Sequence, residues 1–218
     1  RGADTDDVRY YAGWIRDIAK GTALAARTKE EVTVLAGTYN MVPNDVLADR
    51  VYVHMQRYFP CKWTDEEQEF AKKIQKEMGK PELGMCTELM NYAKGMKVGG
   101  SSDVGDVSYL VPTTGTLFAA WPQGIPPHHW GAVACNGMSI ARKAVESAMK
   151  TMACMGLDVL TKPEVVQAAK EEFLKHTAAK PYQTLCEFNS PLGGKMDMKE
   201  RHHFDCVVHQ VCDHMGLN

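Results

Sequence analysis

The chain has 218 residues, 44% of them apolar and 24% charged, which is ordinary for a globular protein and sufficient for a core of useful size. Its net charge of −2 provides no basic surface, which argues against nucleic acid as a partner. No apolar run approaches the ~20 residues of a membrane-spanning helix, so no membrane role is expected. The seven cysteines lack the close spacing of a disulfide framework, which favours reduced thiols and a cytoplasmic location.

Helical and extended patterns alternate in the first third of the chain. Thr5 can cap a helix whose first turn is acidic, because acidic side chains are favoured at the positive end of the helix dipole. Residues 32–36 form a β-branched run that is typical of a strand. Two more helices are predicted: one ends near residue 60, and the other begins at a capping box formed by Thr64 and Glu67.

Later in the chain, residues 82–114 are rich in Gly and Ser and predict a loop, and residues 116–121 form an apolar run like that of a strand covered on both faces. A long helix is predicted over residues 138–155, ending at Gly156, and a second capping box at Thr161 predicts another helix. The predicted core stripe of the long helix comprises Ala141, Val145, Ala148, Met149 and Met152. Strands separated by long helices predict an open α/β sheet.

Two acidic residues lie in a glycine-rich segment at residues 99–108. Asp103 and Asp106 follow Ser102, and the neighbouring glycines allow a tight turn that points carboxylates and backbone amides into a cavity. The alternative is an Asx-turn loop in which both carboxylates satisfy the local backbone. Spacing alone favours this alternative.

A His pair follows the apolar run at residues 116–121. Pro126 and Pro127 hold the backbone stiff ahead of His128 and His129, which suits an imidazole that must face a metal ion at a fixed angle. Open α/β folds also place ligand sites in the loop that leaves the carboxyl end of a strand. The alternative is a solvated pair on a surface loop.

The tail at residues 183–218 is dense in His, Cys and Asp. Cys206, His209, Cys212 and His214 are residue types that bind zinc, but their spacing matches no standard zinc finger or ribbon. We therefore favour an irregular tail over a separate zinc-binding module.

Taken together, the motifs resemble one known family. The matching strings are Ser102-Asp103-Val104-Gly105-Asp106-Val107-Ser108, Val111-Pro112-Thr113 and Pro126-Pro127-His128-His129-Trp130. They are similar to those of the aminobenzoyl-glutamate utilisation group, which belongs to the zinc-dependent aminoacylase/carboxypeptidase G-type metallopeptidases. The resemblance runs from about residue 1 to Tyr182 and lapses after Glu187, so it does not account for the tail.

This resemblance implies a fold and a metal site. Residues 43–182 would be the C-terminal part of a mixed open-sheet α/β zinc-peptidase catalytic domain, and residues 1–42 the second half of a small α+β lid or dimerisation domain. Family enzymes hold two zinc ions, with manganese or cobalt as alternatives, and His128 aligns with their late His ligand. The expected pocket or substrate-binding residues are Ser102, Asp103, Asp106, His129 and Asn40. Asn40 would contact a substrate carboxylate; that it merely caps a turn is an equal alternative.

The resemblance also implies a function that needs a partner. Two metal ions polarise an amide carbonyl and generate hydroxide, while a Glu moves the proton to the leaving amine. The family's other metal ligands and its general base match nothing in these 218 residues, and one His cannot hold a catalytic zinc, which needs about three protein ligands. The N-terminal half of the enzyme, on the same or a separate chain, is therefore the expected partner, in a homo-oligomer formed through the lid.

The expected activity is that of a metal-dependent amidohydrolase, active only when the missing N-terminal half is present. Its substrate would be a small molecule: an N-acyl amino acid, an aminobenzoyl-glutamate-like amide or a dipeptide. The alternative is a non-catalytic assembly or binding subunit that keeps the fold without a complete metal site.

Overall fold

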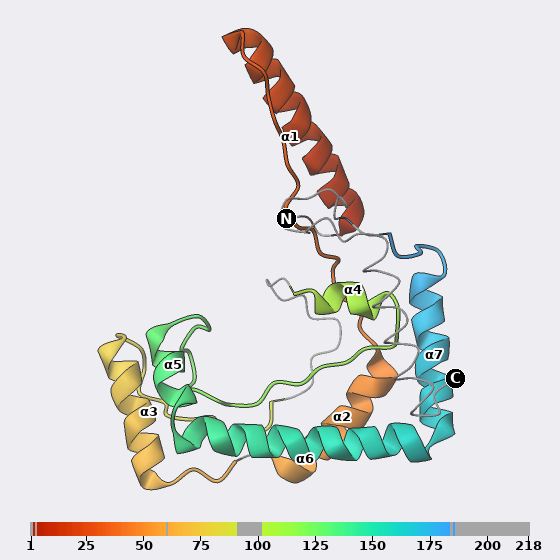
Figure 1. The fold of residues 1–218 in the computed structure, drawn as a ribbon. Helices are drawn as coiled ribbons and strands as arrows, with labels where there is room; N and C mark the ends of the chain where they lie inside the picture. The colour runs from red at the N-terminus through yellow and green to blue at the C-terminus, as the bar shows by residue number, and fades with distance from the viewer. Residues whose placement is uncertain (1, 3, 60, 91–101, 184, 186–218) are drawn as a thin grey trace, which may run out of the picture. The chain divides into compact units, whose positions relative to one another are not determined.

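The computed structural model describes residues 2, 4–59, 61–90, 102–183 and 185. Within these residues all regular secondary structure is helical (Figure 1). The helices are α1 (Thr5–Ala26), α2 (Asp45–Tyr58), α3 (Asp65–Glu77), α4 (Val104–Ser108), α5 (Trp130–Asn136), α6 (Ser139–Thr161) and α7 (Pro163–Thr177). No helix in the described part of the chain is long and apolar enough to cross a membrane.

The prediction of an open α/β sheet was wrong, because the described residues contain no strand. Both expected strands, residues 32–36 and 116–121, are irregular. An apolar, β-branched run becomes a strand only when a neighbouring strand takes up its backbone hydrogen bonds, and no described segment pairs with either run. Residues 116–121 contribute side chains instead: Ala119 and Trp121 pack against a helical core, while Leu117 is 90% exposed.

The chain divides into two compact units. Unit 1 contains Arg1–Met41, Ser101–Asp106 and Tyr182–Asn218, and unit 2 contains Val42–Gly100 and Val107–Pro181. The assignment of residues 1–42, 43–182 and 183–218 to a lid, a catalytic part and a tail stays a prediction. Residues 186–218, including the Cys- and His-rich stretch of the tail, lie outside the described residues.

In unit 1, the helix predicted at Thr5 is present as α1, but it is capped one residue earlier. Its cap is Asp4 rather than Thr5: the Asp4 carboxylate accepts hydrogen bonds from the backbone N–H groups of Asp6 and Asp7. The helix ends at Arg27, whose left-handed backbone (φ 54°) turns the chain and lets its N–H bond back to the helix.

In unit 2, helix α6 packs against α2, α5 and α7. Two buried apolar clusters hold the unit together, and both include residues of α6. The first comprises Ala71, Ile74, Met85, Ile125, Cys135 and Ile140, and the second Leu47, Val51, Met155 and Ala169. The predictions for α2 and α3 are confirmed, including the capping box at Thr64 and Glu67.

The buried face of α6 is not the predicted one. Val145, Met149 and Met152 are 54%, 65% and 50% exposed. The buried side chains are those of Ile140, Ala141, Ala144, Thr151, Met155 and Asp158, so only Ala141 of the predicted stripe is buried. Gly156 does not end the helix, which continues to Thr161; the Thr161 hydroxyl therefore donates to the Leu157 carbonyl instead of capping α7. Because α6 is apolar on two faces, periodicity cannot show which face turns inward.

Two buried carboxylates tie the ends of α6 to its neighbours. Glu67 accepts hydrogen bonds from Ser139 Oγ (2.5 Å) and Lys143 Nζ (2.6 Å) at the N-terminal end. Asp158, near the C-terminal end, binds Arg50, the His54 ring (2.9 Å) and Lys162 Nζ (2.6 Å). A buried charge is tolerated when it is paired and hydrogen-bonded in this way.

The buried hydroxyl of Thr151 has no hydrogen-bond partner in the described structure. We predict that Thr151→Val, which keeps the shape and removes the unsatisfied group, raises the free energy of unfolding by about 1 kcal/mol. This change in stability is measured by urea unfolding, monitored by circular dichroism. Thr177→Val is the matched control, because the buried Thr177 hydroxyl donates to the Phe173 carbonyl (2.9 Å); it should be neutral or destabilising. A less stable Thr151→Val variant would contradict the prediction.

The ion cluster at Asp158 gives a pH dependence of stability. The hydrogen bond from Lys162, with those from Arg50 and His54, holds the pKa of Asp158 far below its usual range despite burial. Its stabilisation is therefore fully present above the unfolded-state pKa of ~3.9 and is lost as the pH falls below that value. Asp158→Asn should cost about 2 kcal/mol at pH 7, because hydrogen bonds to a charged group are lost; the difference should shrink below about pH 4. A difference that persists unchanged at pH 3 would contradict this origin.

Candidate functional site

The acidic motif forms a short helix in place of the predicted loop. Ser102 Oγ accepts a hydrogen bond from the Val104 backbone N–H (3.2 Å) at the start of α4. The same hydroxyl lies 3.4 Å from the Asp103 carboxylate, and both side chains are exposed. Ser102 therefore stabilises the start of α4, and the carboxylate of Asp103 lies at the surface of unit 1.

Asp106 braces the segment that carries Asn40. One oxygen of its carboxylate accepts a hydrogen bond from the Tyr39 backbone N–H (3.3 Å), and the other accepts one from the Tyr182 hydroxyl (3.0 Å). Gly105 lies so close to this segment that an added Cβ would stand 2.0 Å from the Tyr39 carbonyl oxygen. The motif thus needs glycine for a close backbone approach, and its second acid holds the backbone next to the exposed Asn40.

Sequence reasoning missed Tyr39, the buried centre of unit 1. Its hydroxyl donates to the Gln183 carbonyl (2.7 Å) and accepts from Arg9 of α1 (2.9 Å) and from the Gln183 N–H (3.2 Å). Its ring lies 5.0 Å from that of Tyr182. These contacts join segments that are 30 to 144 residues apart, so no local pattern could have indicated them.

The two histidines of unit 2 differ in what they do. His129 is the N-cap of α5: its ring Nδ1 accepts a hydrogen bond from the Gly131 N–H (3.3 Å), and the ring lies 5.7 Å from that of Trp130. His128 is exposed, and its ring makes no hydrogen bond with the described residues. The sequence did not indicate that His129 is a cap, because it matches no standard capping residue.

His128 also has an unusual backbone. Its φ is 60°, in the left-handed region, which costs a residue other than glycine on the order of 1 kcal/mol. Strain of this kind is concentrated at functional sites, where the surrounding structure enforces it. Here the backbone after His128 is fixed by the helix cap at His129. The chain before the His pair is fixed by the buried Pro122 and Ile125, and the Trp121 Nε1–H donates a hydrogen bond to the Ile125 carbonyl (3.1 Å).

A complete metal site is not formed within the described ranges, where no group of three His, Cys, Asp or Glu side chains could hold a metal ion. His128 in unit 2 is the predicted ligand that offers an uncommitted ring. The buried Cys135 is no candidate nucleophile, because burial raises the pKa of its thiol to about 11 and keeps it protonated.

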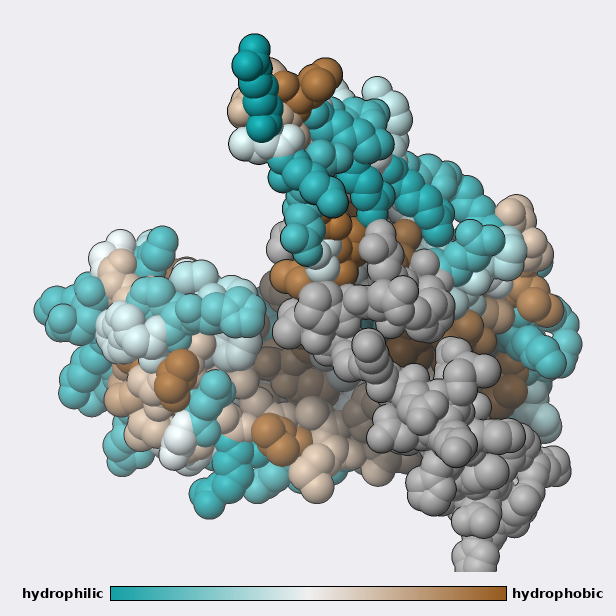
Figure 2. All heavy atoms as spheres, turned by 45° about the horizontal axis from the view of Figure 1, so that its top comes forward, coloured by the Kyte–Doolittle hydropathy of each residue, from teal (hydrophilic) through white to brown (hydrophobic). Residues whose placement is uncertain are grey.

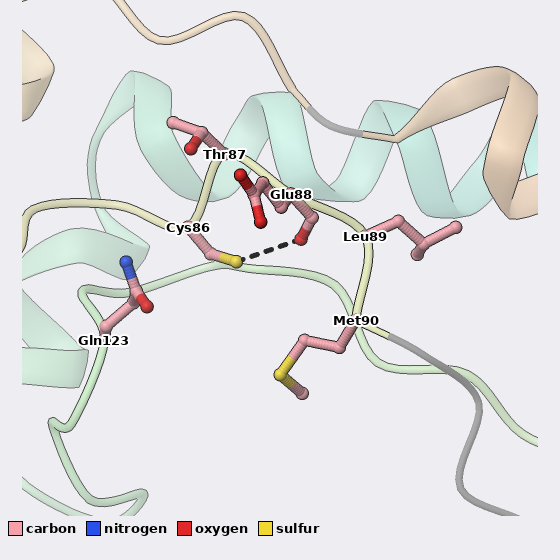
Figure 3. Close-up of a pocket in the computed structure, with 6 residues that line it drawn as sticks. All are labelled: Cys86, Thr87, Glu88, Leu89, Met90 and Gln123. Carbon is pink, nitrogen blue, oxygen red and sulfur yellow. Dashed lines mark hydrogen bonds between the residues drawn. The ribbon is translucent and has the colours of Figure 1, made fainter.

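A shallow hollow of about 430 Å³ lies elsewhere in unit 2 (Figure 3). Its lining residues are Cys86, Thr87, Glu88, Leu89, Met90 and Gln123. The Cys86 thiol is turned toward the Glu88 backbone, to whose carbonyl it donates a hydrogen bond (3.1 Å). The lining residues include no imidazole, and the thiol donates to a backbone carbonyl rather than to a side-chain base, so the hollow shows no paired nucleophile and base.

Comparison with curated proteins relates the chain to part of a hydrolase. The chain is similar to a p-aminobenzoyl-glutamate hydrolase subunit of Escherichia coli (strain K12), with 27% identity over 208 residues. The match covers 84% of this chain and 43% of the relative, so the chain spans less than half the length of that protein. No family model matches, and no solved structure matches. The similarity supports the family link that the motifs suggested.

The close approach at Gly105 can be tested by adding a methyl group. Gly105→Ala should lower the free energy of unfolding by roughly 2–4 kcal/mol, because the new Cβ meets a backbone oxygen that cannot move without breaking the Tyr39 contacts. The matched control is Gly115→Ala, where nothing lies within 4 Å of the added carbon and a change within about 0.5 kcal/mol is expected. Equal stabilities of the two variants would show that the approach is not constrained.

Proposed function

We propose that this chain is part of a metal-dependent amidohydrolase that cleaves an N-acyl amino acid, an aminobenzoyl-glutamate-like amide or a dipeptide. The observation that carries the proposal is the similarity to a p-aminobenzoyl-glutamate hydrolase subunit over 84% of the chain. A hydrolase of this kind cleaves a stable amide, and the required polarisation of the carbonyl and activation of water are what a pair of zinc ions supplies.

His128 is the residue of this chain that we assign to the metal. Its exposed ring makes no hydrogen bond within the described part, and its strained backbone is followed directly by a helix cap. A metal ligand needs this combination of an uncommitted nitrogen and a fixed direction. Zinc fits a neutral imidazole, and manganese or cobalt would also accept one.

The other ligands and the general base belong, in this proposal, to the remaining part of the enzyme. A catalytic zinc takes about three protein ligands, and the described residues of this chain form no such group. The similar protein is itself named as a subunit, and more than half of its length has no counterpart here. That part would lie on the same or a separate polypeptide and would carry the N-terminal half of the enzyme.

The other predicted site residues receive more modest roles. Asp106 is a positioning residue in unit 1, because both of its carboxylate oxygens hold the Tyr39 and Tyr182 segments. Asn40, which follows Tyr39, is exposed and has the amide group suited to a substrate carboxylate. Asp103 would line the substrate pocket of the complete enzyme. Ser102 shapes the start of α4, and His129 caps α5 next to His128, the proposed metal ligand.

The role of His128 is tested in the enzyme assembled from this chain and its remaining part. His128→Ala should lower kcat for release of p-aminobenzoate from p-aminobenzoyl-glutamate by roughly 100-fold or more, because a zinc ligand is lost. Zinc content, measured by mass spectrometry of the metal, should fall from about two ions per site toward one. His176→Ala is the matched control: this half-exposed ring on α7 lies 4.0 Å from Glu172 and should be dispensable for both readouts.

Two outcomes would change the assignment. Full zinc content and activity in His128→Ala would remove His128 from the metal site. An assembled wild-type protein that binds no zinc and hydrolyses none of the three amide classes would favour the alternative function, a non-catalytic assembly or binding subunit.

A further inference from the structure

Helix α6 carries a second apolar face, which we call the outer stripe. It comprises Val145, Met149, Met152, Gly156 and Leu160 of the helix, together with Met138, the residue at its N-cap. These positions recur at the spacing of one helix face, and the side chains other than Gly156 are 42% to 83% exposed. Figure 2 shows apolar side chains (brown) at the surface among polar ones (teal) in the lower part of the view.

The outer stripe is separate from the face that holds unit 2 together. The inner face buries Ile140, Ala144 and Met155 against the neighbouring helices. An amphipathic surface helix needs only one apolar face, so a helix with two is suited to being covered on both. Gly156 supports this interpretation: glycine inside a helix costs about 0.5–1 kcal/mol relative to alanine, and nothing lies within 4 Å of where its Cβ would be.

A groove runs along the first half of the outer stripe. It has a volume of about 500 Å³ and extends from Asn136, at the end of α5, to Met149, with Arg142 and Glu146 among its polar lining residues. Helix α5 itself exposes Trp130 and Val133, and it begins two residues after His128. Apolar side chains are therefore exposed at intervals from the candidate metal ligand to the end of α6.

A second copy of α6 is too small to cover this surface stably. A helix of 23 residues is ~35 Å long and ~10 Å wide, so one face offers on the order of 350 Å². A stable interface buries about 800 Å² per partner. A stable occupant therefore has to cover α5 as well as α6.

We propose that the outer stripe and the exposed side of α5 bind the remaining part of the enzyme, the part that supplies the other metal ligands. This inference rests on the proposed function, because those ligands must approach His128 and the body that carries them then reaches Trp130, Val133 and the groove. More than half of the similar protein's length lies outside the match, which provides a body of sufficient size.

Photo-crosslinking in the assembled enzyme identifies the occupant. Met149 is replaced by p-benzoyl-phenylalanine, and the crosslinked peptides are sequenced by mass spectrometry. Crosslinks to peptides of the same enzyme that lie outside these 218 residues are expected. Crosslinks to α6 of a second copy, or no crosslink at all, would overturn the proposal. The same replacement at the exposed Lys150, about 100° around the helix, is the control and should not react with that part.

A pair of charge variants measures the contribution of the outer stripe. Met149→Glu would place a carboxylate in the covered interface and should lower the Tm of the assembled enzyme by roughly 5 °C or more, whereas Lys150→Glu should shift it by about 1 °C at most. Equal Tm values for the two variants would contradict the inference.

The two experiments distinguish a failure of the metal assignment from a failure of the docking surface. If position 149 crosslinks to the remaining part while His128→Ala keeps its zinc and activity, the docking surface stands and the metal assignment fails. If His128→Ala loses zinc but position 149 gives no such crosslink, the metal assignment stands and the docking surface fails.

Discussion

Burial of one face of α6 is the constraint on which unit 2 depends. Both apolar clusters of the unit include residues of this helix, and a buried carboxylate fixes each of its ends. Burial by itself would raise the pKa of Glu67, but hydrogen bonds from Lys143, Ser139 and the Thr64 backbone outweigh it, and the pKa lies below its usual value. Both carboxylates therefore stay ionised near neutral pH, where their hydrogen bonds restrict how α6 can rotate or slide. The inner face of the helix is fixed in this way, and the outer stripe is left exposed as a consequence.

Local signals in the sequence predicted α2 and α3 well. The capping box at Thr64 and the apolar faces of α2 and α3 depend on interactions within a few residues, so their patterns are legible in the chain itself. The predicted sheet failed for the opposite reason. A strand depends on a partner distant in sequence, and residues 32–36 and 116–121 have the composition of strands without a described neighbour that would complete them. The contacts of Tyr39 with Arg9, Asp106 and Gln183 also join residues far apart in the sequence, and no sequence motif predicts them.

The candidate site residues show a common division of work. In each motif one residue holds the backbone and another is exposed: His129 caps α5 while His128 is exposed, and Asp106 holds the Tyr39 backbone while Asp103 is exposed. The sequence could select the motifs but could not assign these roles, because a histidine is an uncommon cap and an aspartate can serve as a ligand or as a brace. Hydrogen-bond geometry separates them, since a side chain whose acceptors are occupied by the backbone has less to offer a metal ion or a substrate.

Assembly and metal binding are linked through the position of the apolar surface. Fully covering a large apolar side chain contributes about 1.5–3 kcal/mol, so covering Val145, Met149, Met152 and Leu160 provides several kcal/mol before any metal contact is made. That free energy can hold the remaining part of the enzyme against α5 and α6 while the metal ligands of that part approach His128. Apolar contacts away from the metal would then offset the backbone strain at His128 and the entropy lost on association. On this view the exposed face of α6 and the uncommitted ring of His128 have one cause. Each is half of an interaction, and the same part of the enzyme would complete both.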